Sequence, residues 1–216
     1  MQPNLNGLTP SQKCLWPELS QTPTSFLLYG GVALTLRYNH RHSSDFDFFS
    51  NQDIDPDQLL DTVPYLEGAE VLQLAPNTLT CLVKRGGPVK VSFFGLPRLK
   101  RVGQPEEVQG SQIQMASLLD IAGTKASVVQ KRAASRDYLD LHQILCVSKL
   151  ELEDILVAAR QIYGPRFNPH LTLKALSFFN DGDVRTVNAQ ILGELESVVT
   201  RLNLRSLEER LEELNQ

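Results

Sequence analysis

The chain has 216 residues, of which 42% are hydrophobic and 21% charged, with a formal net charge of −4. This composition is close to the globular average and excludes wholesale disorder, and the length allows one or two domains with a substantial core. The mild negative charge argues against a general nucleic-acid coat protein, although it leaves room for a local basic patch.

The sequence also indicates a cellular compartment. Its longest apolar runs are only a few residues, far short of the ~18 that a membrane span needs. Residues 1–12 are polar and do not resemble a secretory signal. The cysteines, Cys14, Cys81 and Cys146, are few, odd in number and far apart, without the paired spacing of a metal site. We therefore expect a reduced, cytoplasmic protein with no membrane partner.

The first half of the chain reads as a mixture of strands and helices. Proline-rich residues 1–24 suggest an irregular lead-in with one helical turn near 11–16. An apolar strand over 25–29 ends at a glycine pair, and helical spacing follows over 32–38. Acids and aromatics then alternate over 45–49, as in a strand with one polar and one buried face. Further on, the pattern predicts a helix over 53–63 and three strands over 70–74, 78–84 and 89–94.

Beyond about residue 97 the pattern becomes helical. Apolar periodicity predicts helices over 116–131, 136–147 and 150–163, a short one around 171–178, and one or two amphipathic helices within 184–214. The expected fold class is α+β, a mixed sheet with helices followed by a helical C-terminal half. The expected domains are the lead-in over 1–24, an α/β core over 25–100 and a helical domain over 111–216, with a boundary within 95–111.

The strongest chemical signal combines a glycine pair with two acids. Gly30-Gly31 precedes a helix, whose N-terminal N–H groups and dipole suit a phosphate. Asp45 and Asp47 are two apart on a strand, so they project together and favour a hard divalent cation such as Mg²⁺. Taken singly, each feature is more often a turn or a solvent-facing strand edge. In this order, they point to phosphoryl or nucleotidyl transfer.

These residues also carry a family resemblance. The first motif runs from Tyr29 to Phe49, and the later motifs are the 118–122 segment, Lys125 and the 136–141 segment. Together they resemble the AbiEii/AbiGii toxin family of nucleotidyltransferases, which have the DNA polymerase β-like nucleotidyltransferase fold. The similarity extends over about 26–180. It implies that the α/β core is a nucleotidyltransferase core and that the helical domain completes the active site.

The resemblance also implies roles for individual residues. Gly30 and Gly31 would hold the nucleotide phosphates, and Asp45 and Asp47 would bind Mg²⁺ and align the attacking group. Lys125 would neutralise phosphate charge, and a helical acid would complete the site; the two candidates are Asp137 and Asp140. From the residues alone, those two acids also fit a solvated helix face with weak surface ion pairs.

A basic cluster lies between the glycine pair and the acids. Arg37 and Arg41, with Ser43, are candidate nucleotide contacts, and the cluster could also meet an RNA acceptor. The alternative is a positively charged loop that balances the acidic pair. His142 and His170 stand alone in the sequence, and we expect structural roles for them.

One strand departs from the family pattern. Many relatives place a third carboxylate on a later central strand, but here the face of the 89–94 strand carries Lys90, Ser92 and Phe94. Ser92 is a poor Mg²⁺ ligand and no base at neutral pH. Gly30-Gly31 also replaces the more common Gly-Ser.

The leading hypothesis is a Mg²⁺-dependent nucleotidyltransferase that moves a nucleoside monophosphate from an NTP to a hydroxyl. By resemblance, the acceptor would be a tRNA or a protein, and the chain would be a toxin with a separate cognate antitoxin. Two alternatives stay open: a catalytically silent nucleotide-binding or interaction module, and a small-molecule nucleotidyltransferase of the antibiotic-modifying type.

Overall fold

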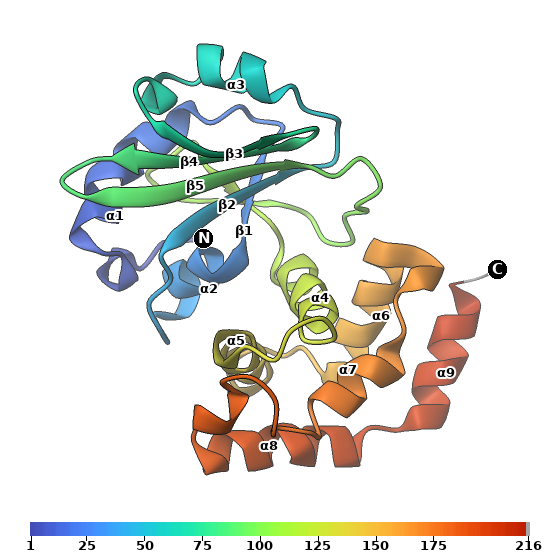
Figure 1. The fold of residues 1–216 in the computed structure, drawn as a ribbon. Helices are drawn as coiled ribbons and strands as arrows, with labels where there is room; N and C mark the ends of the chain where they lie inside the picture. The colour runs from blue at the N-terminus through green and yellow to red at the C-terminus, as the bar shows by residue number, and fades with distance from the viewer. Residues whose placement is uncertain (215–216) are drawn as a thin grey trace. The chain divides into compact units, whose positions relative to one another are not determined.

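The computed structural model describes residues 1–214 and divides into two compact units (Figure 1). The sheet unit consists of residues 1–99 and 104–117, and the helical unit consists of residues 100–103 and the chain from 118 onward. The chain therefore passes between the units three times. Within residues 1–214, no helix combines the length and hydropathy required of a membrane span.

A seven-stranded mixed sheet forms the centre of the sheet unit, in the order β3-β4-β5-β2-β1-β7-β6. The strands are β1 (Leu27–Tyr29), β2 (Asp45–Ser50), β3 (Glu70–Ala75), β4 (Thr78–Lys84), β5 (Pro88–Gly95), β6 (Glu106–Glu107) and β7 (Gln114–Met115). Strand β2 is central: it runs antiparallel to β1 and parallel to β5. This α+β architecture is the expected one, and five of its strands follow the sequence pattern closely.

The alternation along β2 fixes which side chains face the core. Phe46 and Phe48 are buried, and the ring of Phe48 stacks on Phe93 of β5 with centroids 5.5 Å apart. Phe49 lies on the opposite face, where it stacks on Tyr29 at 4.7 Å. Asp45 and Asp47 share that second face, which leaves them only partly buried.

The proline-rich lead-in is more ordered than its composition indicates. It forms 3₁₀ turns η1 (Leu5–Gly7) and η2 (Trp16–Gln21) around helix α1 (Pro10–Leu15), which a Thr9–Gln12 capping box begins. Leu15 and Leu19 are fully buried. Helix α2 (Gly30–Tyr38) packs on β1 and β2, and helix α3 (Pro56–Thr62) and 3₁₀ turn η3 (Pro64–Leu66) complete the unit.

The helical unit contains the helices expected from the apolar periodicity. They are α4 (Leu118–Val128), α5 (Ser135–Val147), α6 (Leu152–Tyr163), α7 (Pro169–Ala175), α8 (Ala189–Arg201) and α9 (Leu204–Glu213), with 3₁₀ turns η4 (Gly164–Arg166) and η5 (Val184–Thr186). Helices α4 and α6 pack closely because Gly123 lies against Ala159: a Cβ on Gly123 would stand 3.1 Å from the Ala159 nitrogen.

Strands β6 and β7 have no counterpart in the sequence prediction. Each is two residues long, and both lie in or just after the segment expected to be a boundary. Strand β7 pairs in parallel with β1 through Leu28 and Met115, so this segment extends the sheet. Residues 100–103, which precede β6, belong to the helical unit, where Asp120 accepts hydrogen bonds from the Val102 and Gly103 amides at 2.7 and 3.0 Å.

Candidate active site

The glycine pair lies against three of the predicted site residues of the sheet unit, Asp47, Arg41 and Ser43. Gly30 opens α2 with φ +74°, a left-handed conformation, and a Cβ there would stand 2.6 Å from Asp47 Oδ2. A Cβ on Gly31 would stand 2.6 Å from both Arg41 Nη2 and Ser43 Oγ. The missing side chains therefore let three polar or charged side chains approach the start of a helix. Five of the sequence candidates meet here.

The two acids of β2 project from the same face, as the spacing predicts. Antiparallel pairing sets Asp47 opposite Tyr29, directly before the glycine pair. Asp45 is two residues earlier on β2, beyond the last residue of β1 that pairs with the strand. It accepts a hydrogen bond from Ser44 Oγ at 2.9 Å. The two carboxylates thus line one surface beside the N-terminus of α2, where the helix dipole is positive.

The neighbouring strand brings a cation to this surface. The parallel register places Lys90 of β5 beside Asp45 and Ser92 beside Asp47. Lys90 Nζ forms an ion pair with Asp45 Oδ2 at 2.7 Å. Ser92 is 3% exposed, and its Oγ accepts a hydrogen bond from Thr80 at 3.3 Å. The position beside Asp45 therefore carries a positive charge, and the one beside Asp47 a buried hydroxyl.

The basic cluster divides in two, with Arg37 in the last turn of α2 and Arg41 after the helix. Arg37 forms an ion pair with Glu106 of β6 at 2.6 Å, and only 12% of its side chain is exposed. Arg41 instead lies next to Gly31 and donates to the His42 carbonyl at 2.9 Å. The structure therefore brings Arg41 to the glycine pair and holds Arg37 against the edge of the sheet. A nucleotide-binding role stays a prediction for both.

The helical candidates form a separate cluster inside their own unit. Lys125 Nζ lies 2.8 Å from Asp137 Oδ1 and 2.6 Å from Asp140 Oδ2, and Arg132 Nε lies 2.8 Å from Asp137 Oδ2. Both acids are fully buried, and the Lys125 side chain is 8% exposed. These are not the surface pairs that the residues alone allow. Whether Lys125, Asp137 or Asp140 acts on a nucleotide stays a prediction.

The charge balance of this cluster affects Asp137 most. Burial raises the pKa of Asp137, but hydrogen bonds from Arg132 and Lys125 and the charges of both cations outweigh burial. The pKa of Asp137 therefore lies below its ordinary value, and the carboxylate is ionised near neutral pH. Two cations and two anions compensate one another in a water-poor environment, which suits a fixed structural network.

Comparison with known proteins identifies a family for this chain. A family model described as the nucleotidyl transferase AbiEii toxin of a type IV toxin–antitoxin system matches residues 17–212. An uncharacterized protein of Aquifex aeolicus (strain VF5) is 29% identical over 158 residues, which cover 72% of this chain and 74% of the relative. The family match includes both the glycine–aspartate surface and the Lys125 cluster.

Solved structures share the fold. A crystal structure from H. pylori, of a protein assigned as a nucleotidyltransferase, has a TM-score of 0.55 at 16% identity and covers 96% of this chain and 99% of its own. The nucleotidyltransferase toxin MenT4 of Mycobacterium tuberculosis H37Rv has a TM-score of 0.57 at 14% identity, covering 94% and 90%. At these identities the likeness concerns the fold.

The family implies, in general terms, a nucleotide substrate, a divalent metal and a cognate antitoxin. The resemblance noted in the sequence is confirmed by the family match over most of the chain. The chain belongs to the AbiEii family of nucleotidyltransferase toxins and is a nucleotidyltransferase enzyme.

Proposed function

We propose that the enzyme is Mg²⁺-dependent and transfers a nucleoside monophosphate from an NTP to a hydroxyl of tRNA. In this reaction the acceptor oxygen bonds to the α-phosphorus, the bond between the α-phosphorus and the leaving oxygen breaks, and pyrophosphate leaves. The acceptor hydroxyl loses its proton. The observation that supports this proposal is the surface where Asp47, Arg41 and Ser43 converge on the glycine pair at the start of α2.

The residues of this surface would have different roles in the reaction, according to their chemistry. The amides of Gly30 and Gly31 and the α2 dipole favour phosphate oxygens, and Arg41 adds a full positive charge beside them. The Asp45 and Asp47 carboxylates add negative charge to the same surface. Lys90 offsets the charge on Asp45, which limits repulsion between that acid and the triphosphate.

The donor set fits Mg²⁺. Two carboxylates on one strand face provide the oxygen ligands that this ion prefers, and the absence of a Cβ on Gly30 leaves Asp47 Oδ2 beside the phosphate-binding backbone. Asp45 and Asp47 would hold the ion, which would neutralise triphosphate charge and align the reacting oxygens.

Pyrophosphate release from each of the four NTPs, with and without total tRNA, tests the proposal. We expect release that needs Mg²⁺ and tRNA, and a loss of at least about 100-fold in Asp45→Asn and in Asp47→Asn, because several kcal/mol of charge stabilisation disappear. Asp61→Asn is the matched control, since Asp61 is an exposed carboxylate on α3 and is not one of the proposed site residues. Unchanged release in both site variants would contradict the assignment.

A second candidate function rests on Lys90 and Ser92. Because a cation and a buried hydroxyl stand beside the two acids, a module that binds nucleotide without transferring it is the main alternative. It predicts NTP binding that Asp45→Asn alters, with no pyrophosphate release under any condition. Release that requires a protein or a small hydroxyl compound in place of tRNA would retain the chemistry and change the acceptor.

A further inference from the structure

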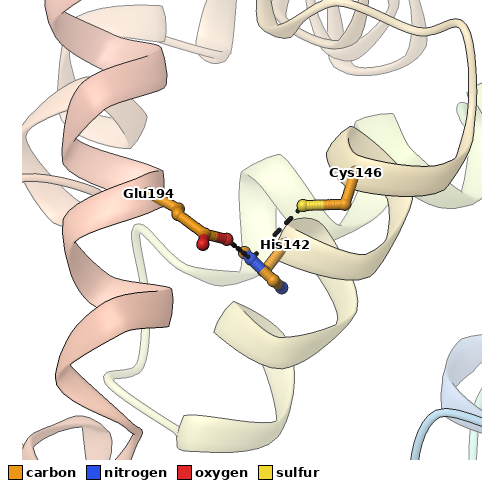
Figure 2. A group of neighbouring side chains, drawn as sticks. All are labelled: His142, Cys146 and Glu194. Atoms are coloured by element: carbon orange, nitrogen blue, oxygen red, sulfur yellow. Dashed lines mark hydrogen bonds and ion pairs between the residues drawn. The ribbon is translucent and has the colours of Figure 1, made fainter.

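A second group of ligand-type side chains lies in the helical unit and shares no residue with the sites described above. It consists of His142 and Cys146 on α5 and Glu194 on α8 (Figure 2). His142 and Cys146 are four residues apart, so they share one face of their helix. Helices α5 and α8 pack together, which brings Glu194 to that face. Three side-chain groups that commonly bind metal ions, an imidazole, a thiol and a carboxylate, therefore lie together.

The three side chains meet at a single ring nitrogen. His142 Nε2 lies 2.5 Å from Glu194 Oε2 and 3.3 Å from Cys146 Sγ, and Figure 2 shows both contacts. One imidazole nitrogen carries either a proton or a lone pair, so it cannot donate to the carboxylate and accept from the thiol at once. A nucleophile–base relay would use the two ring nitrogens separately. Convergence on one nitrogen instead favours a common cation.

The charges agree with this interpretation, and the spacing agrees after a small movement of one side chain. Ligand atoms on one tetrahedral Zn²⁺ lie roughly 3.3–3.8 Å apart, given Zn–N of about 2.0 Å and Zn–S of about 2.3 Å. All three ligand atoms here lie within 4.8 Å of one another, and the 2.5 Å between His142 Nε2 and Glu194 Oε2 would widen by about 0.8 Å when both bind one ion. A thiolate and a carboxylate together neutralise a divalent ion. The Glu194 carboxylate is also positioned by Gln190, whose amide donates to Oε1 at 2.9 Å.

We propose that His142, Cys146 and Glu194 form a Zn²⁺ site that fastens α8 to α5. Binding displaces the thiol proton of Cys146 and leaves any imidazole proton of His142 on Nδ1. The Cys146 side is exposed and the Glu194 side chain is 44% exposed, so solvent or another ligand can supply the fourth position. The site is independent of the nucleotidyl-transfer surface.

A zinc bridge would add to a modest apolar anchor of α8. Of the thirteen residues of α8, Leu195 is the one that is buried, and Ile191, Leu192, Val198 and Val199 are half-buried. Because apolar packing holds this helix only in part, a cross-link to α5 would have a large local effect. We therefore expect Zn²⁺ to slow amide hydrogen exchange in α8 more than in α9.

Metal binding to the full chain tests the proposal. Competition with a chromophoric chelator, in excess Mg²⁺ to occupy the acidic surface, should give one Zn²⁺ per chain. Loss of a residue that only orients a metal ligand typically lowers metal affinity 10–100-fold. Loss of a ligand itself should cost more, so we expect Cys146→Ser and His142→Ala each to lower Zn²⁺ affinity on the order of 100-fold or more. Cys14→Ser is the matched control, because Cys14 is also an exposed free cysteine but lies in the sheet unit.

Two readouts separate ligand loss from misfolding. Co²⁺ should produce a thiolate-to-metal absorption band that disappears in Cys146→Ser and persists in Cys14→Ser. Zn²⁺ should protect Cys146, but not Cys14, from alkylation by iodoacetamide. Glu194→Gln retains the size of the side chain, and circular dichroism confirms its fold. Full Zn²⁺ affinity in a folded Glu194→Gln or Cys146→Ser chain, or equal alkylation of both cysteines with and without Zn²⁺, would overturn the site.

Discussion

Replacing Gly30 with alanine should show whether activity depends on the position of Asp47 independently of the stability of the fold. The substitution has two effects. It forces a residue with a Cβ into φ +74°, which costs about 1–2 kcal/mol. It also places that Cβ 2.6 Å from Asp47 Oδ2, so the carboxylate must move by about 1 Å to reach ordinary contact near 3.5 Å.

The two effects have different consequences. The conformational cost lowers Tm by roughly 2–4 °C per kcal/mol in a chain of this size. A displacement of about 1 Å in a group that positions reactants costs on the order of 100-fold in rate. Gly30→Ala should therefore lose most of its pyrophosphate release at temperatures where the protein is still folded.

Gly68→Ala provides the matched control. Gly68 has φ +70°, nearly the same strain, but a Cβ there would find open space within 4 Å. Both variants should lose a similar amount of Tm, while Gly68→Ala should retain pyrophosphate release within about twofold. If Gly30→Ala is as active as the wild type, or if both variants lose activity equally, the role assigned to Asp47 beside Gly30 is wrong.

Three further predictions concern the helical unit. Lys125→Met removes the cation between two buried acids and should lower the free energy of unfolding by about 3–5 kcal/mol, measured by urea denaturation. Because the pKa of Asp137 is depressed below 3.8 in the folded chain, its stabilising contribution is present above pH 3.8 and is lost as pH falls through the lower folded value. Asp137→Asn should flatten this acid limb in urea titrations, and an unchanged limb would show that other groups produce it. Gly123→Ala should cost about 1–3 kcal/mol, because the new Cβ would press on the Ala159 backbone; a neutral effect would mean that α4 and α6 separate freely.

The parts of the fold that were predictable have strong local patterns. The acid–aromatic alternation of β2 and the glycine pair before α2 are visible in the sequence, and both features are present in the structure. Strands β6 and β7 were not predictable, because a two-residue strand has no period of its own and exists only through its pairing partner. Phe49 lies on the face of the acids, because the alternation gives it the same orientation as Asp45 and Asp47.

The candidate site was partly predictable for the same reason. Spacing alone places Asp45 and Asp47 on one face, and the register with β5 then explains the Lys90 ion pair. Spacing does not reveal that Lys125 points into its unit and contacts acids twelve and fifteen residues later in the chain. His142 stands alone in the sequence as a histidine, and Cys146 has no second cysteine at the spacing of a metal site. The His-x₃-Cys interval on a predicted helix was the available signal, and the third side chain comes from α8.

The threefold passage of the chain between the units has a consequence for biosynthesis. The first 99 residues leave the ribosome before β6 and β7 exist, so the β1 edge of the nascent sheet stays open until Met115 arrives to pair with Leu28. At 5–20 residues per second, the sixteen intervening residues take about 1–3 s to synthesise. Helix α4 begins three residues after β7 ends. The sheet is therefore complete only after residues 100–103 of the helical unit have been synthesised, and a gene split at any one point between residues 99 and 118 leaves at least one fragment with residues that belong to the other unit or a sheet without its edge.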